Sequence, residues 1–444
     1  MVEGWKKVML KDIAKDEKNS FIDGDWIELE HIKDSGIRII QTGNIGIGKC
    51  LDKPESKKFI SIESFKLLNC KKVFTDDILI CRLAEPIGRA CIVPNIENYY
   101  VTSVDVVIFR ENNKRYDKKF ILYVLNYEST LKKAEELAAG STRQRVSRTN
   151  LGNLELEVPE DIREQRKIAE SFETFDNAIE KTHKIIAKYK RIKQGLMQDL
   201  LTKGIDENGQ IRSEETHKFK DSPLGRIPEE WEVVRLGEIA EITSSKRIYF
   251  DEYTEEGIPF YRSKEIIEKA QGLNIEKTLF IPENKYRFIE KHFGTPKTGD
   301  ILITAVGTLG VIYVIKTSDG KFYFKDGNLL WLKNLTGSLI DIELLAYLFQ
   351  EVFEKQKEIL TIGTSQNALT IEKMKEMQIP LSPLPEQQRI ASILSQIDET
   401  IEKEQKYKEK LERIKQGLME DLLTGKVRVN HLIEEGVKNV PQAG

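Results

Sequence analysis

The chain has 444 residues, of which 40% are apolar and 32% are charged, and its formal net charge is −3. Its length suggests about three domains with real cores, and its charge excludes a globally basic protein while leaving room for a local basic face. The longest uncharged apolar stretch, Ile301 to Ile315, is too short for a membrane span, and the N-terminus has no apolar signal core. We therefore expect a soluble, cytoplasmic protein.

Cysteine and histidine spacing argues against a metal site. No Cys-x-x-Cys or His-Glu-x-x-His pattern occurs, so we expect buried, reduced thiols and no zinc. Residues 43–50 nearly match a phosphate-binding loop, but Cys50 replaces the Ser or Thr that would hold magnesium, and no helix start follows. The sequence also lacks a nucleophile elbow and a dinucleotide or methyl-donor loop. Its chemistry indicates recognition and not catalysis. The four cysteines are Cys50, Cys70, Cys81 and Cys91.

Residues 1–162 are predicted to form a mixed globular domain. Short alternating apolar runs predict strands, and a longer periodic stretch predicts a helix. A basic segment, Gly140 to Arg148, follows that helix and contains three arginines and no acid. The predicted strands lie in Ile37–Gln41, Val73–Leu83, Ala90–Val93 and Val101–Phe109, and the predicted helix is Lys118–Leu137.

Two long helices are predicted at residues 163–204 and 385–425, and their sequences repeat. The repeat aligns without a gap at an offset of 222 residues, from Glu164 and Glu386 to Thr202 and Thr424. Apolar residues step by three and four along both segments, which is typical of a coiled coil.

Polar residues interrupt the predicted seam of this coiled coil. They either fray the coil or pair across the seam or with a third protein. Glycines inside both helices cost about 1 kcal/mol each, which suggests a close backbone approach or a bend. The polar seam residues are Thr182, Lys193, Glu404, Lys408 and Lys415, and the glycines are Gly195 and Gly417.

The second half of the chain repeats the plan of the first. Residues 205–227 are predicted to be a linker, residues 228–384 a second globular domain, and residues 426–444 a partly frayed tail. Gly88 corresponds to Gly310, but the loops between such shared anchors differ strongly. A shared scaffold with divergent loops is expected if each domain reads a different target.

Candidate DNA contacts gather in loops of both domains. Arg pairs with guanine edges or phosphate, and Gln and Asn pair with adenine, so loops that carry them suit base recognition. The alternatives are a solvated basic surface and ordinary turn capping. The candidates are Gln41, Thr42, Asn44, Arg82, Thr142, Arg143, Gln144 and Arg145 in the first domain and Tyr261, Arg262, Ser263, Lys264, Ser365, Gln366 and Asn367 in the second.

The sequence resembles the specificity subunit of type I restriction-modification systems. The resemblance covers the whole chain and rests on two variable domains, each followed by a near-identical long helix. It also rests on local patterns, which are Pro385–Ala391, the Arg-Ile-Lys-Gln-Gly-Leu-Met helix ends, Ser222–Pro228 before Trp231, and Gln41–Ile45.

This resemblance implies an α+β fold with two mixed α/β target-recognition domains, two long antiparallel coiled-coil helices and an internal pseudo-twofold duplication. Each domain would read one half of a bipartite DNA site, while the helices would set the spacer and dock two modification subunits. The chain itself would carry no active site, metal or cofactor. S-adenosylmethionine, ATP and magnesium would belong to the modification and restriction subunits. The expected docking residues are Gln165, Arg166, Gln387, Gln388 and Arg389.

Two other functions are open at this point. A coiled-coil scaffold could bind protein partners through the two variable domains. A nuclease or methyltransferase in its own right is opposed by the missing motifs.

Overall fold

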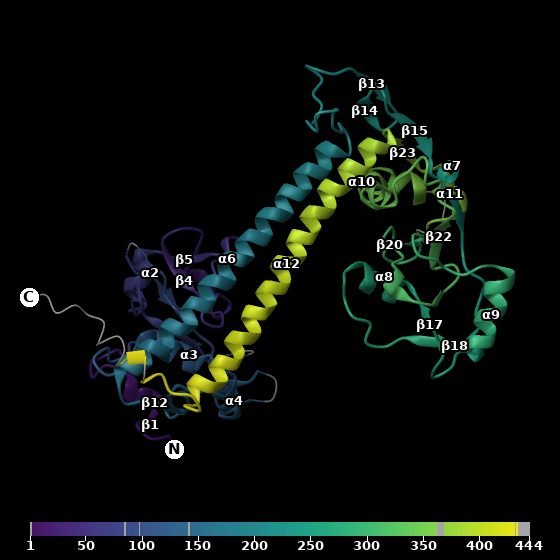
Figure 1. Cartoon of the computed structure of the whole chain (residues 1–444). Helices are drawn as coiled ribbons and strands as arrows, with labels where there is room; N and C mark the ends of the chain where they lie inside the picture. The colour runs from purple at the N-terminus through teal and green to yellow at the C-terminus, as the bar shows by residue number, and fades with distance from the viewer. Residues whose placement is uncertain are drawn as a thin grey trace, which may run out of the picture. The chain divides into compact units, whose positions relative to one another are not determined.

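The computed structural model describes residues 2–83, 86–96, 98–140, 143–361, 368–430 and 432–433 (Figure 1). The chain divides into two compact units, one made of residues 1–183 and 406–444 and the other of residues 184–405. The division falls inside both long helices, α6 (Ile162–Leu200) and α12 (Leu384–Leu423). Each unit therefore combines one globular domain with part of each long helix.

The first unit is built from small sheets and short helices. β1 pairs antiparallel with β12, so the start and the end of the domain lie together. Two four-stranded sheets have the orders β2-β9-β6-β7 and β3-β5-β4-β8, and β10 pairs with β11. The strands are β1 (Trp5–Met9), β2 (Phe21–Asp23), β3 (Ile32–Lys33), β4 (Ile37–Ile40), β5 (Lys58–Ile60), β6 (Ile78–Cys81), β7 (Ala90–Ile92), β8 (Val101–Thr102), β9 (Val106–Phe109), β10 (Ala138–Ala139), β11 (Arg145–Val146) and β12 (Glu155–Pro159). The helices are α1 (Leu10–Ile13), η1 (Leu29–His31), η2 (Thr42–Asn44), η3 (Pro54–Ser56), α2 (Ile62–Leu67), α3 (Lys118–Leu125), α4 (Glu128–Glu136) and α5 (Arg148–Gly152).

The second unit repeats this topology. The sheet β16-β22-β19-β20 matches β2-β9-β6-β7, and the pair β15-β23 matches β1-β12. β17 pairs antiparallel with β18 and parallel with β21, as β4 does with β5 and β8. The strands are β13 (Phe219–Ser222), β14 (Gly225–Pro228), β15 (Glu232–Arg235), β16 (Glu241–Thr243), β17 (Ile258–Tyr261), β18 (Leu279–Ile281), β19 (Ile301–Thr304), β20 (Ile312–Val314), β21 (Tyr323–Phe324), β22 (Leu329–Lys333) and β23 (Gln378–Leu381). The helices are α7 (Leu236–Ile239), η4 (Phe250–Glu252), α8 (Ser263–Ala270), α9 (Glu283–His292), η5 (Thr317–Asp319), α10 (Ile342–Thr361) and α11 (Ile371–Glu376). The predicted α+β fold with an internal duplication is confirmed.

The central strands explain why these segments form sheets. Every residue of β6 and of β19 is buried, and all of them except Thr304 are apolar, which suits strands covered on both faces. The long helices join the same cores, because Ile168 and Phe172 pack into the first domain and Ile390 and Leu394 into the second. The first turns of each helix are thus part of a domain core and not only a coiled-coil seam.

The stretch predicted as one helix at Lys118–Leu137 forms two helices, α3 and α4. Asn126 ends α3, and its side chain donates to the carbonyl oxygens of Ala90 and Leu122 while accepting from the Ala90 amide. A side chain that bonds to β7 in this way competes with helix continuation. Sequence periodicity does not detect this break because the apolar pattern continues through it.

The segments between and after the long helices hold more structure than a linker and a tail. Residues 205–227 contain β13 and most of the hairpin that it forms with β14. Past the end of α12, Val429 is buried in the core of the first unit. The close backbone approach expected at Gly195 and Gly417 is not found. A Cβ added at either glycine would meet no described atom within 4 Å apart from the helix itself.

The four cysteines carry free thiols, and Cys70, Cys81 and Cys91 are buried. Among the described residues, no helix is long and apolar enough to cross a membrane.

Gly310 and its counterpart Gly88 pack a strand turn against a helix. Both have positive φ, and an added Cβ would overlap the ring of Phe353 on α10 at Gly310 and the Cβ of Ala134 on α4 at Gly88. We predict that Gly310→Ala lowers the free energy of unfolding by about 1–3 kcal/mol more than Gly307→Ala. Gly307 has nearly the same φ but open space around it, so it isolates packing from backbone strain. Equal losses of the two variants in denaturant titrations would contradict the prediction.

Candidate nucleic-acid interface

The loop after β4 carries the first candidate contacts. The Gln41 amide donates to Asn44 Oδ1 at 2.9 Å, and the Asn44 side chain donates to the Leu51 carbonyl at 3.0 Å. Asn44 is buried, so its amide group shapes the turn, as the capping alternative predicted. Gln41 and Thr42 are half-buried and remain within reach of a ligand.

Arg89, which the sequence analysis did not identify, holds this loop through hydrogen bonds to its backbone. Its guanidinium donates to the Ile45 carbonyl at 2.7 Å and to the Thr42 carbonyl at 3.0 Å. A buried arginine that bonds backbone carbonyls fixes the loop at both ends. Its position directly after Gly88, a glycine shared by the repeat, is the signal that could have found it.

In the segment that nearly matches a phosphate-binding loop, backbone amides donate hydrogen bonds to carbonyl groups of the protein. The Gly46 amide donates to the Lys49 carbonyl, and the Gly48 amide donates to the Ala90 carbonyl, each at 2.9 Å. Ile45 and Cys50 form an antiparallel bridge, so the segment is a closed turn. The amides of Gly46 and Gly48 are therefore not free to bind phosphate. The described residues also contain no group of three or more His, Cys, Asp or Glu side chains that could hold a metal ion.

In the basic segment of the first domain, Arg143 and Gln144 precede β11, which pairs with β10, and Arg145 is the first residue of β11. Arg143, Gln144 and Arg145 are exposed there, and Arg145 Nε lies 2.8 Å from Asp105. Thr142 lies outside the described residues. Three consecutive exposed residues thus carry amide and guanidinium groups, which suit contact with bases or phosphates.

Arg82 lies beneath this strand pair and not on its surface. It is 4% exposed, donates to the carbonyls of Val104 and Val146, and pairs with Asp23 at 3.1 Å. Burial lowers the pKa of Arg82 from its usual range. These contacts anchor β11 and argue against Arg82 as a direct base contact.

The second domain places its candidates at the start of α8. The Arg262 amide and guanidinium both donate to the carboxylate of Glu265, which is 1% exposed. Tyr261 is buried against Phe322, and Ser263 Oγ donates to the Asn328 carbonyl. Ser365, Gln366 and Asn367 lie outside the described residues.

The turns that follow β4 and β17 are built alike in the two domains. In each, the residue after the strand receives a cap from the side chain three positions later, which makes Gln41 equivalent to Arg262 and Asn44 to Glu265. Lys264 pairs with Glu268 on the surface of α8. Sequence reasoning missed Glu265, although an acid three residues after a helix N-cap signals a capping box.

Of the predicted docking residues, two lie inside the domains. Gln165 accepts from the Asp117 amide and donates to the Arg115 and Pro159 carbonyls. Its repeat counterpart Gln387 accepts from the Asp341 amide and donates to the Leu339 and Ser382 carbonyls. Both glutamines are fully buried, so they join each helix to its own domain. The exposed members of the predicted set are Arg166, Gln388 and Arg389.

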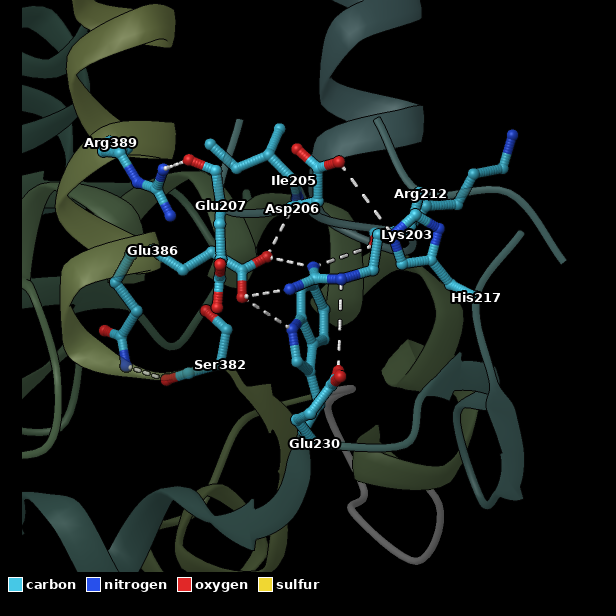
Figure 2. A network of polar contacts seen from close by, with 12 residues as sticks. Lys203, Ile205, Asp206, Glu207, Arg212, His217, Glu230, Ser382, Glu386 and Arg389 are labelled. Carbon is cyan, nitrogen blue, oxygen red and sulfur yellow. Dashed lines mark hydrogen bonds and ion pairs between the residues drawn. The ribbon is translucent and has the colours of Figure 1, made fainter. Parts of the chain in front are cut away.

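A buried acid in the first turn of each helix binds the segment that follows the other helix. The Glu386 carboxylate accepts hydrogen bonds from Arg212 Nη1 and Nη2 at 2.5 and 3.1 Å, and from the Trp231 indole nitrogen at 3.2 Å (Figure 2). In the first unit, Glu164 receives Arg428 at 2.6 and 2.7 Å. Both acids are nearly inaccessible, so each is held by a bidentate ion pair.

A second repeated contact lies about three turns further along each helix. Asp176 accepts from Tyr123 and Lys415 in the first unit, and Lys415 lies over the Tyr123 ring. Asp398 accepts from Tyr347 and Lys193 in the second unit, and Lys193 lies over the Tyr347 ring. Burial, together with the aspartate bond, raises the pKa of each tyrosine. The alternative that polar seam residues pair across the helices is confirmed for Lys193 and Lys415.

These contacts give the direction of the helices within each unit. In the first unit, Glu164 at the start of α6 meets Arg428 beyond the end of α12, while Asp176 meets the earlier Lys415. The α6 and α12 segments of that unit therefore run antiparallel. The pairs of Glu386 with Arg212 and of Asp398 with Lys193 give the same result in the second unit.

Comparison with known proteins gives consistent matches. The family model described as the type I restriction modification DNA specificity domain matches residues 2–191 and 228–413. The type I restriction enzyme MjaVIII specificity subunit of Methanocaldococcus jannaschii is 32% identical over 351 residues, which cover 75% of each chain. The putative MjaX specificity subunit of the same organism is 28% identical over 446 residues, covering 96% of this chain and 94% of that one.

Solved structures share the fold. The S subunit of a type I restriction-modification system from M. genitalium has a TM-score of 0.58 and 18% identity, covering 94% of this chain and 96% of that one. A chain from a structure on complex assembly and conformational transition of the type I R-M system has a TM-score of 0.55 and 17% identity, with coverages of 95% and 98%.

The buried Arg212–Glu386 pair gives a stability prediction. Arg212→Met leaves the Glu386 carboxylate buried without its counter-charge, so we expect the free energy of unfolding to fall by about 3–5 kcal/mol. Arg226→Met removes an exposed arginine that pairs with Glu214 and Asp221, and it should leave the free energy of unfolding nearly unchanged. Adding Glu386→Gln to Arg212→Met should recover most of the loss, since no buried charge remains. Equal thermal midpoints for the two single variants would show that the pair is unimportant.

Proposed function

Because this chain belongs to the family of type I restriction-modification specificity subunits, we propose that it is the DNA-recognition subunit of such a complex. The observation that carries this proposal is that the specificity-domain family model matches the chain twice. Each match contains one globular domain and most of the long helix that follows it. Each domain would accordingly read one half of a bipartite DNA site.

In this proposal, the base and phosphate contacts come from polar side chains that the fold leaves accessible. In the first domain these are Gln41 and Thr42 on the loop after β4, and Arg143, Gln144 and Arg145 at the start of β11. In the second domain the proposed contacts are Arg262 and Lys264 at the start of α8. The candidates that lie outside the described residues remain predictions from the sequence. Asn44, Arg82 and Tyr261 shape these surfaces from within.

The long helices would set the spacer between the half-sites and dock two modification subunits. α6 has 39 residues, which corresponds to roughly 58 Å, and one turn of DNA spans roughly 34–36 Å. A helix of this length suits a gap of unread base pairs. Arg166, Gln388 and Arg389 are the accessible candidates for docking, although Arg389 already donates to the Glu207 carbonyl.

We also propose that the chain is non-catalytic and acts in the cytoplasm. The modification subunits would bind S-adenosylmethionine and methylate adenine, and the restriction subunits would use ATP and magnesium. Support comes from the closed turn at residues 45–50, which leaves no phosphate-binding loop, and from the missing catalytic motifs in the sequence.

Binding of the purified chain to random duplex DNA tests this function. Because phosphate contacts release counterions, we expect the logarithm of the association constant to fall linearly with the logarithm of the salt concentration. Arg143→Gln should reduce that slope by about 0.9, the effect of one lost phosphate contact, while Arg226→Gln on the β13–β14 hairpin should leave it unchanged. A protein that binds no duplex DNA, or binds it without salt dependence, would favour the protein scaffold instead.

A further inference from the structure

The first domain contains a hollow that none of the proposed contacts uses. It has a volume of about 610 Å³, within the range of roughly 300–1,000 Å³ that is usual for small-molecule sites. We name it the Tyr99 pocket, and its chemically distinctive lining residues are Arg38, Lys57, Phe59, Asn98, Tyr99 and Tyr100. Three aromatic rings, two cations and an amide thus surround one space.

The sheet β3-β5-β4-β8 builds this pocket. Arg38 on β4 is the register partner of Phe59 on β5. β4 runs parallel to β8, with Ile39 opposite Val101, so Tyr100 comes to lie beside Arg38. The Arg38 guanidinium carbon is 5.7 Å from the centre of the Tyr100 ring. The cation and the aromatic walls are therefore fixed by strand pairing and not by loop conformation.

Tyr99 forms a supported aromatic wall. Its ring packs against Phe65 with centroids 5.2 Å apart, and Lys72 Nζ lies 4.3 Å from its centre. The tyrosine remains half-buried and lines the pocket. A planar ligand would find a ring whose position is already set, which suits stacking of a nucleobase.

The cationic end of the pocket is incompletely neutralised. Within the part of the chain that the structure describes, Arg38 and Lys57 share a single carboxylate, that of Asp52, at 2.6 and 3.3 Å. Asp52 is exposed, and Arg38 Nε is buried with no hydrogen-bond partner among the described residues. An anionic group that entered here could accept a hydrogen bond from Arg38 Nε. It would also be attracted by the positive charge that remains after Asp52 has neutralised one of the two cations. Phosphate is such a group.

The second domain shows that the fold does not require this cation. Register pairing aligns Phe59 with Phe280 and Tyr100 with Phe322, while Pro259 on β17 stands where β4 has Arg38. The aromatic positions are thus shared scaffold, and the charged end belongs to the first domain alone among these aligned positions. A residue that the scaffold can do without is a candidate for binding.

The pocket also adjoins the proposed recognition loop. β4 leads directly into Gln41, and Asp52 belongs to the segment that returns from that loop. From the aromatic walls, the cationic end and this position, we propose that the Tyr99 pocket binds one nucleotide of the recognised DNA with its base outside the helical stack. The base would stack on Tyr99 and its phosphate would replace Asp52 at Arg38 and Lys57. This inference rests on the proposed DNA-binding function.

The test compares a perfectly paired duplex with the same duplex carrying one unpaired, bulged nucleotide. Fluorescence anisotropy of labelled DNA gives the affinity of the full chain for each. Wild type should bind the bulged duplex roughly 5- to 100-fold more tightly, because one more nucleotide reaches the pocket and stacks there. Tyr99→Leu should lose that preference, by roughly 5- to 100-fold for one lost stacking contact, while its affinity for the paired duplex stays the same. Tyr407→Leu, an exposed tyrosine on α12, is the matched control.

Two charge variants move the affinity for the bulged duplex in opposite directions. Lys57→Gln should weaken it, and Asp52→Asn should tighten it, since the cations lose their competing carboxylate. Misfolding cannot produce the second result. Lys133→Gln on α4 and Asp16→Asn near β2 make the same charge changes at exposed positions and should leave the preference unchanged.

The outcomes separate the two levels of the hypothesis. If the paired and bulged duplexes bind equally well, or if the pocket variants behave like their controls, the pocket proposal is wrong and the proposed function stands. If wild type binds neither duplex, the proposed function fails. Free dAMP is added as a competitor to distinguish the source of the nucleotide. Displacement of the bulged duplex by dAMP at the same concentration as the DNA would assign the pocket to a free nucleotide and overturn the DNA assignment.

Discussion

Two repeated aspartates, Asp176 and Asp398, hold the architecture of this protein together. Each binds a lysine from the other long helix and a tyrosine from a domain helix, so one carboxylate joins three elements. A carboxylate with both an ammonium and a hydroxyl partner is satisfied in a half-buried place where an unpaired charge would be costly. Because the contact occurs once in each unit, each domain is fixed to both helices by the same chemistry.

A second repeated ion pair lies in the first turn of each long helix. Glu164 and Glu386 are buried, and each receives an arginine from the segment that follows the other helix. Buried ion pairs add little net stability compared with apolar packing, but losing one partner is expensive, so they favour one arrangement over alternatives. These repeated contacts join each domain to the long helices, so the accessible loops are not needed to stabilise that arrangement. Those loops, including Gln41–Thr42 and residues 143–144 before β11, are free to differ between the domains and to carry recognition.

The sequence predicted the parts that depend on periodicity and repetition. The duplication, both long helices and the runs that contain β4, β6, β7, β8 and β9 follow from apolar spacing and repetition, and the pairing of Lys193 and Lys415 was one of the alternatives raised. Their partners were not predictable, because contacts such as Lys193 with Asp398 join residues far apart in the chain. Sequence also gives no direction for a polar side chain. Asn44, Arg82, Gln165 and Gln387 carry suitable groups for binding, but hydrogen bonds within the domains, most of them between distant parts of the chain, hold these side chains in the interior.

Sequencing of methylated adenines in the host genome, with and without this chain, tests the central claim most directly. If the chain supplies the sequence specificity of a type I complex, one bipartite methylated motif with a fixed spacer should vanish when the chain is removed and return when it is restored. A methylated genome that stays the same in both cases would contradict the account.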